Sequence, residues 1–388
     1  MPAISHILDD LPAPGADALA HSRRLAGHIR DAIAAAGGRI PFSRYMDLAL
    51  YAPGLGYYSA GARKFGAAGD FITAPELSPL FSRCLARQCA EVLREVPQGS
   101  ILELGAGSGL MAADLLLELQ ALGALPAEYL ILEVSADLRE RQRQTLIAKA
   151  TALASRVRWL DAPPENFTGA MVGNEVLDAL AVERFLKRPG GFDEYCVRVE
   201  GDGFAWETRP AGEQLAATLA AFETTLAAPL GSGYVSEMNL RLTPLVSSLA
   251  ASLECGALIL MDYGYPRAAY YHPERSMGTL MCHYRQRAHD DPFLYPGLQD
   301  ITAHVDFTAV AEAGTSSGLE LAGYTTQAHF LMALGVAGLG GADMKTAQQV
   351  KLLTLPEEMG ERFKAIGFTK GIETVLSGFA LRDLSRQL

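Results

Sequence analysis

The sequence contains few cysteines and lacks any long apolar run. Its five cysteines are Cys84, Cys89, Cys196, Cys255 and Cys282. No two of them have the CxxC spacing of a zinc or redox motif, so we expect reduced, buried thiols and no metal site. Charged residues interrupt every apolar stretch well short of the roughly 20 residues that a membrane helix needs. The sequence therefore predicts no membrane insertion.

The first residues lack the features of a targeting segment. Asp9 and Asp10 stand where a secretory signal would need an apolar core. The arginine-rich, acid-poor composition of a transit peptide is missing as well. We therefore expect a cytoplasmic location.

Basic residues are also under-represented. The 388 residues include 33 Lys and Arg against 44 Asp and Glu, which gives a formal net charge of −11. This balance argues against nucleic acid as a partner, because binding to phosphates requires clustered basic side chains. It is compatible with a single basic substrate residue, which acidic groups would attract.

From Gly99 onwards the sequence alternates between strand and helix patterns, which is typical of a doubly wound, mostly parallel α/β sheet. Such a sheet binds its ligand at the carboxyl ends of its strands. The pattern predicts strands over 100–104, 129–134, 157–160, 170–173 and 257–263, with helices over 110–122 and 136–150.

The remaining segments break this rhythm. We expect residues 1–95 to form a helical and loop region that covers the cofactor site, and residues 96–388 to form the Rossmann-like core. Within the core, hairpin signals predict an antiparallel insertion with a helix at about 181–240. Residues 264–304 are predicted to form a long irregular loop, and long loops in compact domains usually serve binding or catalysis.

The most informative stretch is 100–109, an apolar strand followed by a glycine-rich turn and a helix start. Dinucleotides and S-adenosylmethionine both bind at such turns. The third glycine, Gly109, comes one residue too early for the GxGxxG dinucleotide pattern. Glu103, two residues before the turn, would repel a diphosphate but suits the cationic methionine end of S-adenosylmethionine. A nicotinamide dinucleotide is the alternative cofactor.

Two further acidic residues follow the next strands. Glu133 ends the second strand, where a carboxylate can accept hydrogen bonds from ribose hydroxyls in either cofactor class. Asp161 follows the third strand and is expected near an adenine amino group. Acidic residues are also common at strand ends simply because that edge is solvated. The order of Glu103, the glycines, Glu133 and Asp161 is more specific than any one of them.

Several further motifs stand out, at 56–59, 69–76, 103–109, 173–180, 262–264, 278–280 and 300–307. Together they resemble the MidA-like family of S-adenosylmethionine-dependent methyltransferases. This family is related to the mitochondrial complex I assembly methyltransferase, and the likeness spans roughly residues 40–330. One departure is Val176-Leu177, where the family commonly has a bulkier, aromatic-containing segment.

The resemblance implies a class I methyltransferase fold and a protein substrate that is methylated on an arginine, with a complex I subunit as the implied substrate. The positions expected to contact S-adenosylmethionine are Thr73, Pro75, Glu76, Glu103, Gly105, Ala106, Gly107, Gly109, Glu133, Asp161 and Asn174.

An arginine acceptor also needs carboxylates, because a charged guanidinium is oriented best by bidentate contacts. Glu175 and Asp178 follow the fourth strand, three residues apart, on what could be one helical face. Asp262 ends the next strand. We expect Glu175 and Asp178 to bind the guanidinium, with Asn174 orienting cofactor or substrate. The alternative is that both acids only stabilise a helix N-terminus.

Two other functions stay open at this point. One is a cofactor-binding assembly chaperone without essential catalysis, which would dock partners through the insertion and residues 264–304. The other is a nicotinamide-dependent oxidoreductase.

Overall fold

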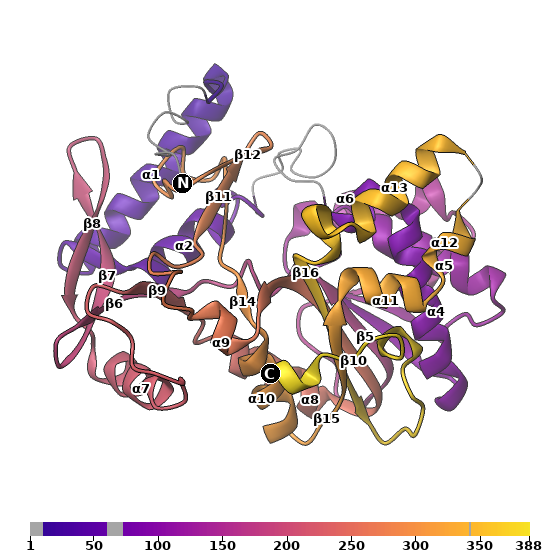
Figure 1. Ribbon diagram of the computed structural model, residues 1–388. Helices are drawn as coiled ribbons and strands as arrows, with labels where there is room; N and C mark the ends of the chain where they lie inside the picture. The colour runs from indigo at the N-terminus through magenta and orange to yellow at the C-terminus, as the bar shows by residue number, and fades with distance from the viewer. Residues whose placement is uncertain (1–10, 60–72, 341–342) are drawn as a thin grey trace. The chain divides into compact units, whose positions relative to one another are not determined.

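The computed structural model describes residues 11–59, 73–340 and 343–388. The chain divides into two compact units, each built from separate stretches of sequence (Figure 1). The insertion unit comprises Met1–Phe71, Ala179–Arg241 and Arg267–His304. The sheet unit comprises Ile72–Asp178, Leu242–Pro266 and Val305–Leu388. Residues 73–95, which we grouped with the N-terminal region, thus belong to the sheet unit.

The sheet unit is built on a mostly parallel sheet, which confirms the predicted architecture. The order of its strands is β15 (Glu320–Thr326), β16 (Phe363–Lys370), β10 (Leu253–Tyr265), β5 (Phe167–Asn174), β2 (Ser100–Leu104), β3 (Tyr129–Leu132) and β4 (Val157–Leu160). Neighbouring strands from β10 to β4 are all parallel, and β16 runs antiparallel between β10 and β15. After β2 the chain adds β3 and β4 on one side of it, and it then crosses to add β5 and β10 on the other side. Ligands of doubly wound sheets bind at such a switch point. The two-residue β14 (Val305–Asp306) pairs with the end of β10.

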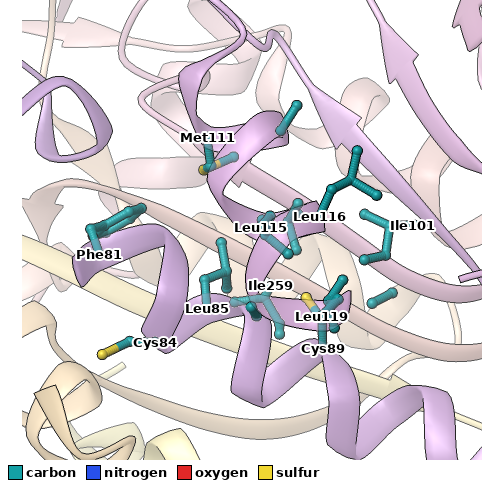
Figure 2. Close-up of a cluster of buried hydrophobic side chains, with 14 of the residues drawn as sticks. Phe81, Cys84, Leu85, Cys89, Ile101, Met111, Leu115, Leu116, Leu119 and Ile259 are labelled. Atoms are coloured by element: carbon teal, nitrogen blue, oxygen red, sulfur yellow. The ribbon is translucent and has the colours of Figure 1, made fainter. Parts of the chain in front are cut away.

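One face of this sheet is covered by an apolar helical layer. Figure 2 shows Phe81 and Leu85 of one helix and Leu115 of another gathered beside Ile101 and Ile259 of the strands. Burial of each such side chain contributes about 1.5–3 kcal/mol. The layer contains α4 (Pro79–Glu95), α5 (Leu110–Ala121), α11 (Gln327–Ala333), α12 (Val336–Leu339) and α13 (Met344–Thr354).

The opposite face is covered by α8 (Leu242–Ser252) and α10 (Phe307–Ser316). Leu258 and Phe368 are paired across β10 and β16, so both side chains point to the face opposite Ile259. A Cβ atom on Gly314 of α10 would lie 2.5 Å from the Phe368 ring. Helices therefore cover both faces, and the free ligand surface lies at the strand ends.

The insertion unit has an antiparallel sheet, as predicted for residues 181–240. Its strands are β1 (Arg39–Pro41), β6 (Glu183–Arg188), β7 (Gly191–Glu200), β8 (Gly203–Pro210) and β9 (Val235–Met238). Three main helices accompany it: α1 (Ala16–Ala35), α2 (Phe42–Tyr51) and α7 (Glu213–Glu223). Aromatic rings form part of the core, where Trp206 packs 4.8 Å from Phe42 and 4.9 Å from Phe293 between ring centroids.

The expectation that residues 264–304 are irregular was wrong. This segment contains the short helix α9 (Arg267–Tyr270) and a three-stranded antiparallel sheet. Its strands are β11 (Met281–Tyr284), β12 (Arg287–His289) and β13 (Asp300–Thr302). The β11–β12 turn uses Arg285 and Gln286 at φ of 49° and 62°, where glycine or asparagine is usual. The turn between β11 and β12 therefore lacks the glycine or asparagine from which a hairpin is usually predicted.

Within the described ranges, no helix combines the length and apolar character required to cross a membrane.

The packing in Figure 2 predicts unequal effects for two leucines of α5. Leu115 is fully buried and Leu117 is 38% exposed. We expect Leu115→Ala to lower the free energy of unfolding by about 2–5 kcal/mol, because it leaves a cavity. Leu117→Ala should cost less than about 1 kcal/mol. Urea unfolding of both variants measures the difference, and equal losses would contradict the assigned packing.

Candidate cofactor and active site

The glycine turn after β2 adopts a backbone that only glycine accommodates easily. Gly105, Gly107 and Gly109 have φ of 60°, 51° and 82°, all in the left-handed region. A Cβ atom on Gly109 would also lie 2.9 Å from the Cα atom of Gln142 in α6 (Ala136–Lys149). The turn therefore combines a special backbone with close packing against α6, and it presents main chain at the edge of the sheet.

Glu103 lies in β2 directly below this turn. Its side chain is buried and accepts a hydrogen bond from the Tyr129 hydroxyl on β3 at 2.5 Å. Burial raises the pKa of Glu103 to about 7, the Tyr129 hydrogen bond lowers it, and the charge of Glu133 raises it. A nearby positive charge would favour the ionised form of this carboxyl group.

Glu133 follows β3 and is 8% exposed. Its Oε1 accepts a hydrogen bond from the Ser135 backbone at 2.9 Å, and its Oε2 accepts one from Gln142 Nε2 at 3.2 Å. Burial raises the pKa of Glu133, while these hydrogen bonds lower it. The next residue, Val134, is 75% exposed and offers an apolar surface beside the carboxylate. This pair can accept from ribose hydroxyls and pack against a base.

Asp161 follows β4, and Arg139 connects it to the end of β3. Arg139 Nη2 lies 2.6 Å from Asp161 Oδ1, and the same guanidinium donates to the backbone oxygens of Glu133 and Leu160 at 2.6 and 3.0 Å. The Asp161 side chain is 86% exposed. The structure thus brings Glu133 and Asp161 to neighbouring strand ends, while contact of Asp161 with adenine stays a prediction.

The described part of the 69–76 motif lies against the glycine turn, while residues 69–72 fall outside the described ranges. Thr73 precedes the short helix α3 (Ala74–Leu77), in which Pro75 occupies the first turn. The Ser108 hydroxyl of the glycine turn donates to the Glu76 carboxylate. Gln349 of α13 holds the same segment by donating to the Leu77 backbone oxygen at 3.2 Å. Of the predicted cofactor contacts, Glu76 is thus linked directly to the turn.

The segment after β5 was expected to start a helix, and this expectation was wrong. Residues 175–180 form bends and turns. Glu175 has a φ of 52°, and its N–H donates to the Met261 backbone oxygen of β10 at 2.9 Å. A helix cannot continue through this left-handed residue. Glu175 and Asp178 therefore do not share a helical face.

Asp262 of β10 holds this loop in place. Its Oδ2 accepts hydrogen bonds from the Leu177 and Asp178 backbone N–H groups at 2.9 and 3.2 Å, and its Oδ1 accepts from Tyr263 N–H at 2.9 Å. The side chain is fully buried. The loop conformation thus depends on a carboxylate from the neighbouring strand.

Three carboxyl groups lie close together around this loop. Burial raises the pKa of Asp262 well above its usual range, and the charges of Asp178 and Glu175 raise it further. Asn174 Nδ2 donates to Glu175 Oε1 at 3.0 Å. Its buried Oδ1 has no hydrogen-bond partner in the part of the chain that the structure describes. This edge is therefore suited to a cationic group with several donors.

The residues at the ends of β2 and β3 fit S-adenosylmethionine. The glycine turn gives close access to main chain, Glu133 beside Val134 matches a nucleoside, and the acidic Glu103 matches a cationic ligand better than a diphosphate. These observations favour a positively charged nucleoside cofactor over a dinucleotide.

Comparison with known proteins decides the family. A family model for S-adenosyl-L-methionine-dependent methyltransferases matches residues 84–325, which is more than half of the chain. The chain belongs to this family. A Burkholderia thailandensis protein crystallised with S-adenosyl-homocysteine is 49% identical, with a TM-score of 0.92, and the match covers 97% of this chain and 100% of that chain. The fold is that of a class I methyltransferase, and S-adenosylmethionine is the cofactor.

Curated relatives are more distant but equally extensive. The Drosophila melanogaster homologue of the mitochondrial protein arginine methyltransferase NDUFAF7 is 29% identical, with 86% of this chain and 82% of that protein covered. The Caenorhabditis elegans homologue is 27% identical, with 87% and 85% covered.

Sequence reasoning missed three residues that lie at the strand ends beside the glycine turn. Val134 could have been found as an apolar residue directly after the acidic strand end. Arg139 and Gln142 lie within α6, where polar residues usually indicate a solvated face. Only the fold reveals that they point to the strand ends.

The burial of Glu103 predicts a pH-dependent stability. Its pKa rises from 4.5 to about 7 in the folded chain, so across this window the folded state keeps a proton that the unfolded state has lost. The free energy of unfolding contributed by Glu103 therefore falls as pH rises, by about 3 kcal/mol in total. Relative to wild type, Glu103→Gln should become more stable from about pH 5 to about pH 7 and then level off.

Urea unfolding of the cofactor-free protein across this pH range measures the effect. Glu320→Gln, at an exposed position of β15, controls for the loss of one carboxylate. A difference between Glu103→Gln and wild type that is constant with pH would contradict the raised pKa.

The geometry of the turn predicts that Gly109→Ala weakens binding of S-adenosylhomocysteine by tenfold or more, because the new methyl group must displace the turn from Gln142. Gly123→Ala is the matched control: Gly123 also has a positive φ, 66°, but a Cβ atom there would meet no atom within 4 Å. It should cost stability only. Isothermal titration calorimetry distinguishes the two, and equal affinities would argue against the role of the turn.

Proposed function

We propose that this protein methylates an arginine side chain of a protein substrate. The observation that carries the proposal is the carboxylate-rich loop after β5, which contains Glu175 and Asp178 and is held by Asp262. The names of the NDUFAF7 relatives, which are protein arginine methyltransferases, support the same acceptor. Following the MidA-like resemblance, we further propose a subunit of respiratory complex I as the substrate.

The proposed roles follow from what a guanidinium requires. The bound cofactor supplies an electrophilic methyl group on its sulfonium. As the new N–C bond forms and the S–C bond breaks, the acceptor nitrogen must lose one proton. Glu175 and Asp178 would orient the guanidinium through bidentate contacts and accept that proton. Asp262, whose oxygens accept backbone N–H groups, would fix the loop, and Asn174 would orient Glu175.

Removing the charge of Glu175 should therefore abolish catalysis while leaving the cofactor bound. We expect Glu175→Gln to reduce methyl incorporation by about 10²-fold or more, because orientation and proton transfer both depend on the carboxylate. Mass spectrometry of arginine methylation in cells lacking the gene, complemented with wild type, Glu175→Gln or Glu320→Gln, measures the effect. Calorimetry with S-adenosylhomocysteine should give near wild-type affinity for both variants.

One outcome would contradict the proposal, and a second would show that catalysis is not the essential role of the protein. Unchanged arginine methylation in cells without the gene would exclude arginine as the acceptor. Full cellular function of Glu175→Gln despite absent methylation would instead support a cofactor-binding assembly role without essential catalysis.

A further inference from the structure

Gln142 is a fully buried amide at the centre of α6. Its Nε2 donates to the Gly107 backbone oxygen and to Glu133 Oε2, both at 3.2 Å. Its Oε1 accepts from Trp159 Nε1 on β4 at 2.7 Å. One side chain thereby connects the glycine turn, the carboxylate after β3 and the neighbouring strand.

The orientation of this amide is determined by its surroundings. The Trp159 indole can only donate, so it must face the amide oxygen of Gln142. Both amide hydrogens then point to the acceptors on Gly107 and Glu133. Exchanging the amide nitrogen and oxygen of Gln142 would break all three hydrogen bonds. In the observed orientation both amide N–H groups are used.

The backbone of Gln142 contributes as well. Gly109 packs so closely against it that a Cβ atom would approach its Cα atom to 2.9 Å. The glycine turn therefore rests on the main chain of Gln142 at one end and is hydrogen-bonded to its side chain at Gly107. Displacement of this residue would move the turn and Glu133 together.

We infer that Gln142 is a positioning residue of the cofactor site, which holds the Glu133 carboxylate and the glycine turn in the arrangement that the adenosyl ribose requires. The inference rests on the proposed binding of ribose hydroxyls by Glu133. Its hydrogen bond also lowers the pKa of Glu133, whereas burial raises it, and so favours the ionised, accepting form. Gln142 need not touch the cofactor to affect its affinity.

Two substitutions separate positioning from packing. Gln142→Leu removes all three hydrogen bonds, whereas Gln142→Glu keeps the Trp159 contact but places a carboxylate beside Glu133. A packing role predicts the milder effect for Gln142→Glu. Positioning of Glu133 predicts the opposite: binding of S-adenosylhomocysteine about tenfold weaker in Gln142→Leu and weaker still in Gln142→Glu.

The control is Gln88→Leu, at another fully buried glutamine, which lies in α4. Gln88 Nε2 donates to Glu91 at 2.7 Å, and its Oε1 accepts from Gly378 N–H at 2.8 Å. This variant should lower the thermal midpoint of the cofactor-free protein without changing the affinity for S-adenosylhomocysteine. The comparison shows how much stability is lost when a buried amide outside the cofactor site is removed.

Calorimetry in the Glu133→Gln background completes the test. If Gln142 acts through Glu133, the additional penalty of Gln142→Glu over Gln142→Leu shrinks there, because only the Gly107 backbone oxygen still opposes the new carboxylate. Retention of the full penalty would overturn the inference, as would wild-type affinity in Gln142→Leu. Wild-type affinity in Glu133→Gln alone would instead refute the ribose assignment. None of these results bears on the arginine acceptor, which the methylation experiment tests separately.

Discussion

Buried carboxylates at the strand ends determine how the loops of the sheet unit are arranged. Glu103, Glu133 and Asp262 are each less than a tenth exposed. Removing such groups from water costs several kcal/mol unless donors replace the lost hydration. The donors are a tyrosine hydroxyl from β3, an amide from α6 and the backbone of the loop after β5. Satisfying these three groups therefore helps to place the glycine turn, α6 and the loop after β5.

The distribution of these acids matches an electrostatic difficulty of the proposed reaction. A sulfonium cofactor and a guanidinium acceptor are both cations, and they must approach within about 3–3.5 Å. Acidic groups near β2 and β3 can offset the charge of the cofactor, and those of the 175–178 loop and β10 can offset that of the acceptor. Because burial weakens screening, a few carboxylates suffice for this compensation.

The sequence predicted features that depend on local pattern. The strands 100–104 and 157–160 were confirmed at their exact bounds, because each is a short, mostly apolar segment between clear breaks. The conformation of Glu175 was not predictable, since its N–H donates to the Met261 backbone oxygen, more than 80 residues away, and the loop that follows it is held by Asp262. Gln142 was hidden for a related reason: its partners lie in the glycine turn, directly after β3 and on β4, and a helical glutamine normally faces solvent.

The position of β16 has a consequence for synthesis of the chain. β10, whose core is almost entirely buried, lies between β5 and β16, and β16 comprises Phe363–Lys370. During translation, roughly 100 residues must therefore follow β10 before its second edge can be paired. Until then the strand that carries Asp262 presents an apolar, unpaired edge, which favours aggregation. The nascent protein should thus depend on chaperones during this stage, when the glycine turn has already been synthesised.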